Sequence, residues 1–319
     1  YIQLLTQESE LNRSDKMEDI KNLNSDTVEQ LRKEYENMEA EIADSDSIWD
    51  KIKNMIKSNK LAAVSLIIIL LFCFCAIFAP FVAPQDPTLQ NYENVRANPS
   101  SIHLLGTDEL GRDVFSRIIY GARISLVIGL VPTTISMVIG TVLGLMAGFL
   151  GKKVDFAIMR LADIMLAFPS LLLAMVVMYT LGATLINIFI ALSVVSWAGT
   201  ARVVRSQTLS LKEKEFVEAA KSIGVKNYVI MIRHILPNCL PSLIVLFTMN
   251  IPGSILSESS LSFLGIGAQP PASSWGLMVV HGKQWLFSEP WIAISPGIAI
   301  LILVLAFNFL GDGLREKPL

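Results

Sequence analysis

Residues 61–83 read LAAVSLIIILLFCFCAIFAPFVA, an apolar run without a charged side chain. A helix of about 20 apolar residues crosses the hydrocarbon core of a membrane. Five further charge-free runs lie at 124–151, 164–181, 183–201, 240–257 and 290–311. The sequence therefore predicts an all-α polytopic membrane protein with six transmembrane helices. We expect the fifth helix to continue past Glu258 to Gly265, and Gly182 to form a tight turn between the third and fourth.

The composition of the 319 residues fits a membrane protein and argues against other classes. Hydrophobic residues make up 52% and charged residues 17%, below the roughly 25% charged residues usual for soluble domains. This disfavours a soluble enzyme and excludes a disordered chain. The net charge of −2 gives no basic field, so no nucleic-acid partner is expected. Neither a disulfide framework nor a metal site is predicted from the three cysteines, Cys73, Cys75 and Cys239.

The first sixty residues are more highly charged than the rest and hold fourteen acidic and nine basic side chains. Residues 1–47 are interpreted as an acidic cytoplasmic extension and 48–60 as an amphipathic helix at the membrane surface, with an ordinary amphipathic helix as the alternative. Because the chain begins with Tyr1, residues 1–16 are a candidate vector remnant, with Met17 as the natural start. The segments expected to follow are a first transmembrane helix at 61–83, an extracytoplasmic segment at 84–120, a five-helix core at 121–312 and a cytoplasmic tail at 313–319.

Lysine and arginine predict the orientation of the spans. If both termini are cytoplasmic, the flanks and loops on the inner side carry sixteen of these bases and those on the outer side carry five. Cytoplasmic loops of membrane proteins are enriched in Lys and Arg. Both termini and the charge-rich loop 202–239 are therefore predicted to be cytoplasmic.

Gly140, Gly144 and Gly148 repeat at four-residue intervals in the second span. Small residues on one stripe of a helix let a neighbouring helix approach closely within a membrane. We interpret this stripe as a packing surface, with a glycine-lined passage for a substrate as the alternative.

The loop 202–239 predicts two short amphipathic helices joined by a glycine. Ser210 and Glu213 fit a capping box, which would start the first helix at Ser210, and Gly224 would end it. The apolar face of the first helix is predicted to hold Phe216, Ala219, Ala220 and Ile223. A second helix would end at Pro237 and present Val225, Tyr228, Val229, Ile232 and Ile235. These faces either pack on the ends of the chain's own spans or dock into another protein.

The same loop resembles the EAA loop in the permease subunits of bacterial ABC importers. The resemblance rests on Glu218-Ala219-Ala220, Gly224 and Leu236-Pro237, although His234 stands where the family has isoleucine. Further segments resemble the dipeptide and oligopeptide branch of the family, at 105–113, 167–169, 258–265, 274–276 and 311–315. The resemblance covers about 48–315, and within that branch the chain is similar to the C-type permease subunit.

In that family the EAA loop inserts into a groove of an ATPase subunit as a coupling helix. The resemblance implies a type I importer permease fold and the import of short peptides across a bacterial cell membrane. The implied partners are a homologous second permease, two ABC ATPase subunits and an extracytoplasmic peptide-binding protein. The residues that it assigns to ATPase coupling are Glu218, Ala219, Ala220, Gly224, Leu236 and Pro237.

The sequence contains no Gly-x4-Gly-Lys-Ser/Thr loop for holding ATP phosphates. We therefore expect no enzymatic site and no cofactor on this chain, with ATP and Mg²⁺ held by partner ATPases. The rival hypotheses are an importer of nickel or another small solute from the same branch, an ATP-independent secondary transporter, and a structural membrane scaffold.

Charged side chains near membrane depth are candidates for a translocation pathway. Asp163 either lines such a pathway or forms a local ion pair at the cytoplasmic boundary, close to Arg160. Glu258 either lines the pathway or forms hydrogen bonds with Ser257 and Ser259. The outer segments 84–122 and 267–289 either contact partner proteins or are plain connections.

Overall fold

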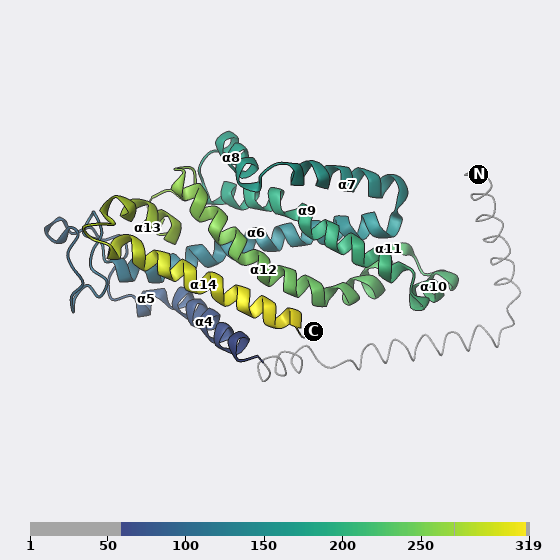
Figure 1. The fold of residues 1–319 in the computed structure, drawn as a ribbon, viewed down its shortest axis with the longest axis horizontal. Helices are drawn as coiled ribbons and strands as arrows, with labels where there is room; N and C mark the ends of the chain where they lie inside the picture. The colour runs from purple at the N-terminus through teal and green to yellow at the C-terminus, as the bar shows by residue number, and fades with distance from the viewer. Residues whose placement is uncertain (1–58, 271, 317–319) are drawn as a thin grey trace, which may run out of the picture.

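The protein is described by a computed structural model that covers residues 59–270 and 272–316 (Figure 1). The interpretations of 1–47, of most of 48–60 and of the end of the tail 313–319 fall outside these residues. Within the described ranges the structure is helical, and the only β-type pairing is an isolated bridge between Thr107 and Asp113. In chain order the α-helices are α4 (Lys60–Ile77), α5 (Ala79–Val82), α6 (Val114–Leu150), α7 (Lys152–Ala167), α8 (Ser170–Leu181), α9 (Leu185–Lys212), α10 (Glu215–Ser222), α11 (Asn227–Val229), α12 (Leu236–Phe263), α13 (Trp275–Gly282) and α14 (Trp291–Glu316).

The described chain has five helices that are long and apolar enough to cross a membrane: α4, α6, α9, α14 and the continuous helix Asn227–Phe263. The helices α7 and α8, which meet at an angle of 93°, make a sixth span if the bent pair is counted as one. The all-α prediction is confirmed, and the predicted count of six is consistent with the structure when this bent pair is taken as the third span, which is not one straight helix. Pro169 is the physical reason, because a residue before proline avoids the helical region, and Phe168 is extended with φ −96° and ψ 142°.

The two ends of the described chain lie side by side. A Cβ atom added to Gly313 would lie 2.6 Å from the Cβ of Ala62, so the start of α4 packs against the end of α14. Figure 1 shows the start of α4 and the end of α14 near the middle of the long axis, away from the end formed by α13 and residues 83–113.

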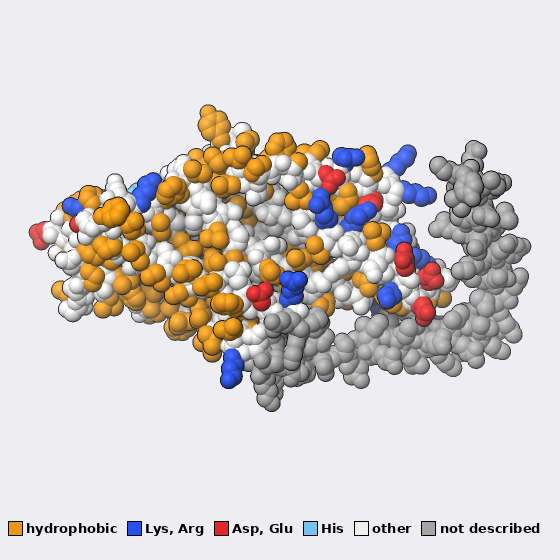
Figure 2. All heavy atoms as spheres, viewed as in Figure 1, with side chains coloured by type: hydrophobic (Ala, Val, Ile, Leu, Met, Phe, Trp, Pro, Cys, Tyr) orange, Lys and Arg blue, Asp and Glu red, His pale blue; other side chains and the backbone are white. Residues whose placement is uncertain are grey.

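Charge and hydrophobicity divide the surface in the way that a membrane requires. Figure 2 shows hydrophobic side chains over the middle of the bundle, whereas Lys, Arg, Asp and Glu gather chiefly at the end that carries α10 and the start of α7. Exposed leucine and isoleucine side chains are numerous on α4 and α14. These helices thus present a surface suited to lipid or to another apolar helix.

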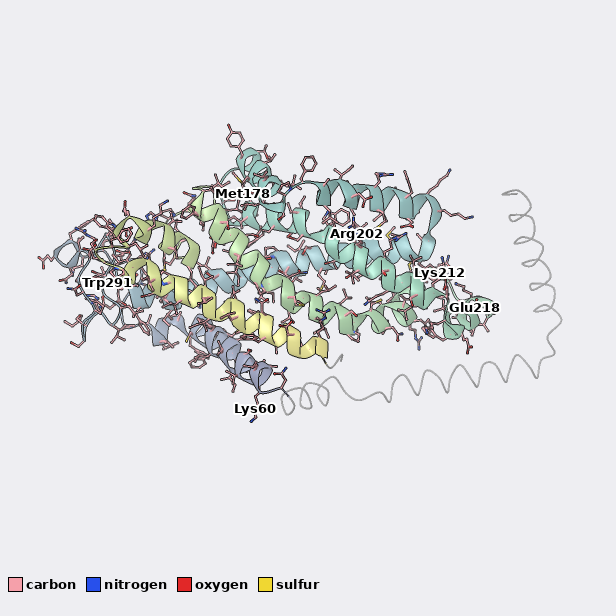
Figure 3. All side chains as sticks on the ribbon, in the orientation of Figure 1. Lys60, Met178, Arg202, Lys212, Glu218 and Trp291 are labelled. Atoms are coloured by element: carbon pink, nitrogen blue, oxygen red, sulfur yellow. The ribbon has the colours of Figure 1, made fainter. Side chains whose placement is uncertain are left out.

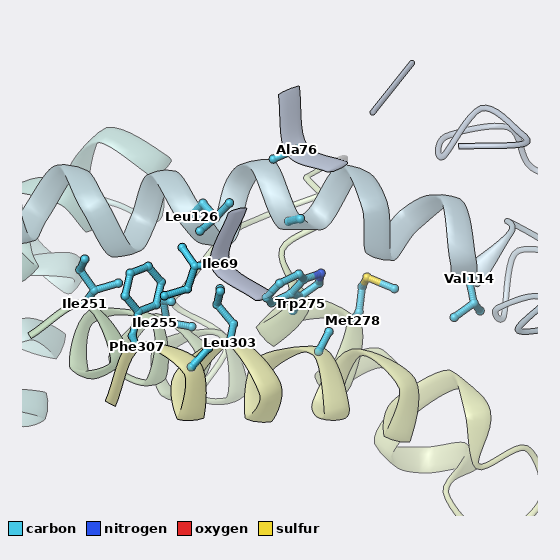
Figure 4. Packing of buried hydrophobic residues seen from close by; sticks show 13 residues of the cluster. Ile69, Ala76, Val114, Leu126, Ile251, Ile255, Trp275, Met278, Leu303 and Phe307 are labelled. Atoms are coloured by element: carbon cyan, nitrogen blue, oxygen red, sulfur yellow. The ribbon is translucent and has the colours of Figure 1, made fainter. Parts of the chain in front are cut away.

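The main hydrophobic core joins α4, α6, α12, α13 and α14 around Trp275 (Figure 4). Trp275 is fully buried, its indole N–H donates to the carbonyl oxygen of Ile118 at 2.9 Å, and Phe72 contacts its ring edge-on at 5.4 Å between centroids. A buried indole needs such an acceptor, since an unpaired N–H is costly away from water. The short helix α13 is thereby fixed between the outer halves of α6 and α14.

The segment before α6 is held together by a cluster of buried ionic side chains. The Asp108 carboxylate accepts hydrogen bonds from the backbone N–H groups of Leu110 and Arg112. It also forms ion pairs with the side chains of Arg112 at 2.7 Å and Arg117 at 3.4 Å. Asp113 caps α6 by accepting from the backbone N–H of Ser116. These bonds attach the segment 105–113 to the first turn of α6.

The glycine stripe of α6 faces α9. Cβ atoms added at Gly140, Gly144 and Gly148 would all lie within 2.7 Å of atoms on α9, so only glycine permits this separation between the two helices. The packing interpretation is thus confirmed, and the alternative of a glycine-lined passage is not supported.

Replacing Gly144 with alanine is expected to lower the free energy of unfolding by about 1–3 kcal/mol, the usual cost of overpacking. The added methyl group would lie 2.6 Å from the carbonyl oxygen of Ala201. Gly199→Ala is the matched control on α9, because a Cβ there meets nothing within 4 Å. Thermal unfolding of the purified chain in detergent would measure both variants, and equal stability would contradict close packing at Gly144.

Candidate functional site

The predicted hairpin in the loop 202–239 is present, but its boundaries differ from those predicted. The helix start predicted at Ser210 is wrong, because α9 runs without a break to Lys212 and α10 begins at Glu215. Residues 202–212 are mostly good helix formers that simply extend the span. The helix end predicted at Pro237 is also wrong, since Pro237 lies in the first turn of α12, where its missing N–H is tolerated.

Gly224 forms the turn of the hairpin, as the sequence predicted. Its φ of +82° lies in the left-handed region, which is readily adopted by glycine only. The N–H of Gly224 donates to the carbonyl of Lys221, and the N–H of Val225 donates to that of Ala220. These two bonds end α10 and reverse the chain toward α11.

The inner face of the hairpin packs against the chain's own spans. Val217 and Ala220 from α10 are fully buried, as are Ile230 and Ile235 from the second arm. They form one cluster with residues of α6, α9 and α12, namely Leu145, Phe149, Val204, Cys239 and Leu243. The first of the two alternatives, packing on the ends of the spans, therefore holds for this face.

The predicted apolar faces were only partly right. Ile223 is 47% exposed, Tyr228 57% and Ile232 62%, whereas Val217 and Ile230 were not predicted and are buried. The second arm contains a π-helical segment, Ile230–Ile235, in which residues are spaced differently from an α-helix. The α-helical spacing assumed for this arm consequently selected the wrong positions.

The outer face of the hairpin remains open at the end of the bundle. Figure 3 shows Glu218 at this extremity, beyond Lys212 and at the opposite end from Trp291. Glu218 and Gly224 are exposed and Ala219 is half-buried. With Ile223, Tyr228 and Ile232, these residues form an exposed surface of mixed apolar and acidic character, which we call the hairpin surface.

Leu236 and Pro237, the last residues of the proposed pattern, lie where the second arm enters α12. Leu236 is half-buried, Pro237 is exposed, and the preceding His234 is buried. The side-chain amide of Asn238 donates to the backbone carbonyl of His234 at 2.6 Å. The structure thus places these residues at the base of the second arm, whereas Glu218, Ala219 and Ala220 lie in the first.

Phe149, at the end of α6, contacts lysines of α9 and of the first arm α10, and it was not identified from the sequence. Lys212 donates to the Phe149 carbonyl oxygen at 2.7 Å and lies 5.6 Å from its ring centroid, and Lys221 of α10 lies 5.4 Å from the same centroid. Lysines near the last carbonyls of a helix also complement its dipole. No sequence signal distinguishes Phe149 from the other aromatic residues of the spans.

Two ion pairs join α7 to α9 near the same end. Asp155 pairs with Arg205, and Asp163 pairs with Arg202 at 2.7 Å. Asp163 therefore has an ion-pair partner, but that partner is Arg202 on another helix and not the neighbouring Arg160. Both members of the Asp163 pair are about half exposed, with side chains 51% and 53% accessible, so the pair contributes little to stability.

Glu258 lies elsewhere, near the C-terminal end of α12. It is 1% exposed, and one carboxylate oxygen accepts hydrogen bonds from the hydroxyls of Ser262 at 2.7 Å and Ser274 at 2.9 Å. The predicted partners Ser257 and Ser259 are wrong, because Ser274 reaches Glu258 only after the chain has folded back before α13. Its geometry is that of a residue joining α12 to the start of α13.

A cavity of about 180 Å³ lies between α6, α8, α9 and α12. Neither Asp163 nor Glu258 lines it, so their suggested role in a pathway remains a prediction without support from this cavity. Most of its wall is made by hydroxyl, amide and small side chains, and we call it the hydroxyl cavity. Its lining residues are Thr133, Ser136, Ser170, Leu171, Ala174, Leu192, Val195, Ser196, Asn250, Gly253, Ser254 and Ser257.

An apolar bundle of up to six spans, with an anchored, charged hairpin at one end, defines a multi-pass membrane protein. The chain belongs to the family of binding-protein-dependent transport system inner membrane components, whose family model matches residues 140–317. A second model, the N-terminal transmembrane domain of oligopeptide transport permease C, matches residues 47–99. The resemblance to the permease subunits of ABC importers is thereby confirmed.

Similar proteins cover most of the chain. The dipeptide transport system permease protein of Alkalihalophilus pseudofirmus is 46% identical over 85% of this chain and 89% of its own length. The glutathione transport system permease protein of Pectobacterium atrosepticum is 42% identical over 84% and 89%, respectively. The oligopeptide transport system permease protein of Bacillus subtilis is 41% identical over 85% and 88%.

Proposed function

We propose that this chain is one of two permease subunits in an ATP-driven importer of short peptides, and that it is coupled to partner ATPases through the hairpin. The names of the similar proteins support a peptide substrate. The coupling role is supported by the different surroundings of the two faces of the hairpin. One face is buried against three spans through Val217, Ala220, Ile230 and Ile235, while the hairpin surface around Glu218 is open.

The proposed mechanism uses this arrangement to transmit movement. Two ATPase subunits, which hold ATP and Mg²⁺, close upon each other and displace the hairpins of the two permeases. The buried cluster passes the displacement to α6, α9 and α12, because a close-packed interior moves as a unit. The spans then alternate between outward-open and inward-open arrangements. In this proposal both termini are cytoplasmic, and the outer segments receive a peptide-loaded binding protein.

Replacing Glu218 with lysine is expected to lower ATP-dependent peptide uptake about tenfold and to reduce co-isolation of the ATPases. Reversing a charge at a complementary interface costs several kcal/mol at most. The fold should be preserved, because the Glu218 side chain is exposed. Uptake in vesicles that contain the whole importer, and purification through a tag on this chain, would measure the two effects.

Glu213→Lys is the matched control, since it makes the same charge change at an exposed residue just outside the proposed pattern. Equal loss in both variants would mean that general charge, and not the position of Glu218, matters. Uptake by vesicles that hold this chain alone would favour a secondary transporter. Uptake of a nickel complex but not of trialanine would favour the small-solute alternative.

A further inference from the structure

The hydroxyl cavity lies at membrane depth. Asn250 stands near the middle of α12, Ser196 is in α9, and Ser170 begins α8 directly after the bend at Pro169. Ser170, Ser196, Asn250 and Gly253 are exposed, so the cavity opens on the surface of the chain. The deeper wall is held together by a hydrogen bond of 3.0 Å between Thr133 of α6 and Ser254 of α12.

The polar groups at the mouth of this cavity are available for a ligand. Within the described residues, Ser170, Ser196, Asn250 and Ser257 make no side-chain hydrogen bond. Other hydroxyls of the spans behave differently, since those of Thr134, Thr180 and Thr248 donate to backbone carbonyls one turn earlier in their helices. An unpaired amide facing hydrocarbon is costly, so this face is suited to contact with water, a solute or another polar surface.

The chemistry of the wall selects a type of solute. Hydroxyls and side-chain amides each provide both a donor and an acceptor, and a peptide bond offers one N–H and one C=O. No Asp, Glu, Lys, Arg or His lines the cavity, so nothing in it selects a charged side chain or ligates a bare metal ion. Leu171, Leu192 and Val195 provide apolar contact without hydrogen bonds.

The size of the cavity indicates a shared site. Pockets that enclose small ligands measure roughly 300–1,000 Å³, whereas this one is about 180 Å³ and open. A second chain facing the mouth would enlarge and close it. The part formed by this chain is thus sufficient for a short stretch of peptide backbone.

We propose that the hydroxyl cavity is a peptide-backbone contact site. In it, Asn250, Ser196 and Ser257 form hydrogen bonds with the main-chain amides of the transported peptide and make no specific contact with its side chains. The proposal rests on the proposed function. It predicts that this chain accepts many peptide sequences and discriminates against peptides whose backbone N–H groups are blocked.

The test uses the whole importer in vesicles with two probes: radiolabelled trialanine and trialanine methylated at its central peptide nitrogen. Asn250→Leu is expected to raise the KM for trialanine uptake about fivefold to tenfold, the effect of losing one hydrogen bond of roughly 1–1.5 kcal/mol. Its preference for trialanine over the methylated probe should shrink by a similar factor. The binding protein is the same in every sample, so the change in preference reports on the permease.

Ser260→Ala is the control, because Ser260 lies on the same helix, outside the cavity, and donates to the carbonyl of Leu256 at 2.8 Å. Ser257→Ala is a second and milder test if Asn250→Leu does not co-isolate with the ATPases. The proposal is overturned if the cavity variants show the same KM for trialanine, and the same preference for trialanine over the methylated probe, as Ser260→Ala. If the unaltered importer takes up no trialanine with ATP, the proposed function fails instead.

Discussion

Replacing Gly224 with valine is expected to lower ATP-dependent trialanine uptake by the assembled importer about fivefold to thirtyfold. Gly224 has a φ of +82°, and a left-handed conformation costs an L-residue roughly 1–2 kcal/mol, with β-branched side chains affected most. A Cβ at this position meets nothing within 4 Å, so the strain acts only on the backbone of the turn. An energy of this size changes a conformational equilibrium about 5–30-fold. Under the proposed coupling role, the variant would therefore depopulate the arrangement of the two arms that fits an ATPase.

Two variants separate this cause from a general loss of folding. Gly265 has a φ of +81°, equally open surroundings, and a position just beyond the far end of α12; Gly265→Val should therefore leave ATPase co-isolation intact. Gly224→Asn should keep most of the uptake, because asparagine tolerates the left-handed region. Equal losses in the valine and asparagine variants of Gly224 would show that the backbone conformation is not the reason.

Replacing Asp108 with asparagine is expected to destabilise the outer end of the bundle by about 3–5 kcal/mol, the usual cost of removing one partner from a buried ion pair. Asp108 is 4% exposed and Arg117 is 3% exposed. In asparagine an NH₂ group replaces one carboxylate oxygen. This NH₂ group would face the arginine side chains, which have only hydrogen-bond donors, so neither group would have an acceptor there. Arg117 would keep the Pro87 carbonyl as an acceptor at 3.3 Å, but its charge would remain buried without Asp108.

Thermal unfolding of the purified chain, followed by tryptophan fluorescence, would measure this loss, since Trp275 and Trp285 lie in the outer half. Asp86→Asn is the matched control on the same outer segment. Asp86 is exposed and accepts from the backbone N–H and hydroxyl of Thr88, so its replacement should change the stability by well under 1 kcal/mol. An unchanged midpoint for Asp108→Asn would refute the structural role of the ionic cluster.

Much of the fold follows from charge-free runs, because the absence of charge over about 20 residues is a direct requirement of the membrane. The bend between α7 and α8 could have been predicted from the sequence, since Pro169 lies inside the third charge-free run. Its angle could not, because tertiary packing sets the direction after the break. The extension of α9 through Arg202 and Arg205 was missed because charge ends a hydrophobic run without ending a helix.

The candidate site was predictable where backbone conformation decides it and unpredictable where distant residues meet. Gly224 was identified because few other residues fit its turn. The buried positions of the second arm were misplaced by the π-helical segment, whose spacing a sequence does not reveal. Glu258 and Ser274 are separated by the loop before α13, and the hydroxyl cavity combines residues from four helices. Such contacts come from the packing of the helices and not from any local pattern.

The continuity of the helix from Asn227 to Phe263 has a mechanical consequence. The helix is 37 residues long, but it includes the π-helical segment Ile230–Ile235 and contains Pro241 and Pro252, so it is continuous without being straight. Tyr228 of the hairpin surface and Asn250 of the cavity wall both lie on this helix. Under the proposed function, a displacement of the hairpin by an ATPase would reach the cavity wall along one helix, so coupling and contact with the peptide would depend on the same element.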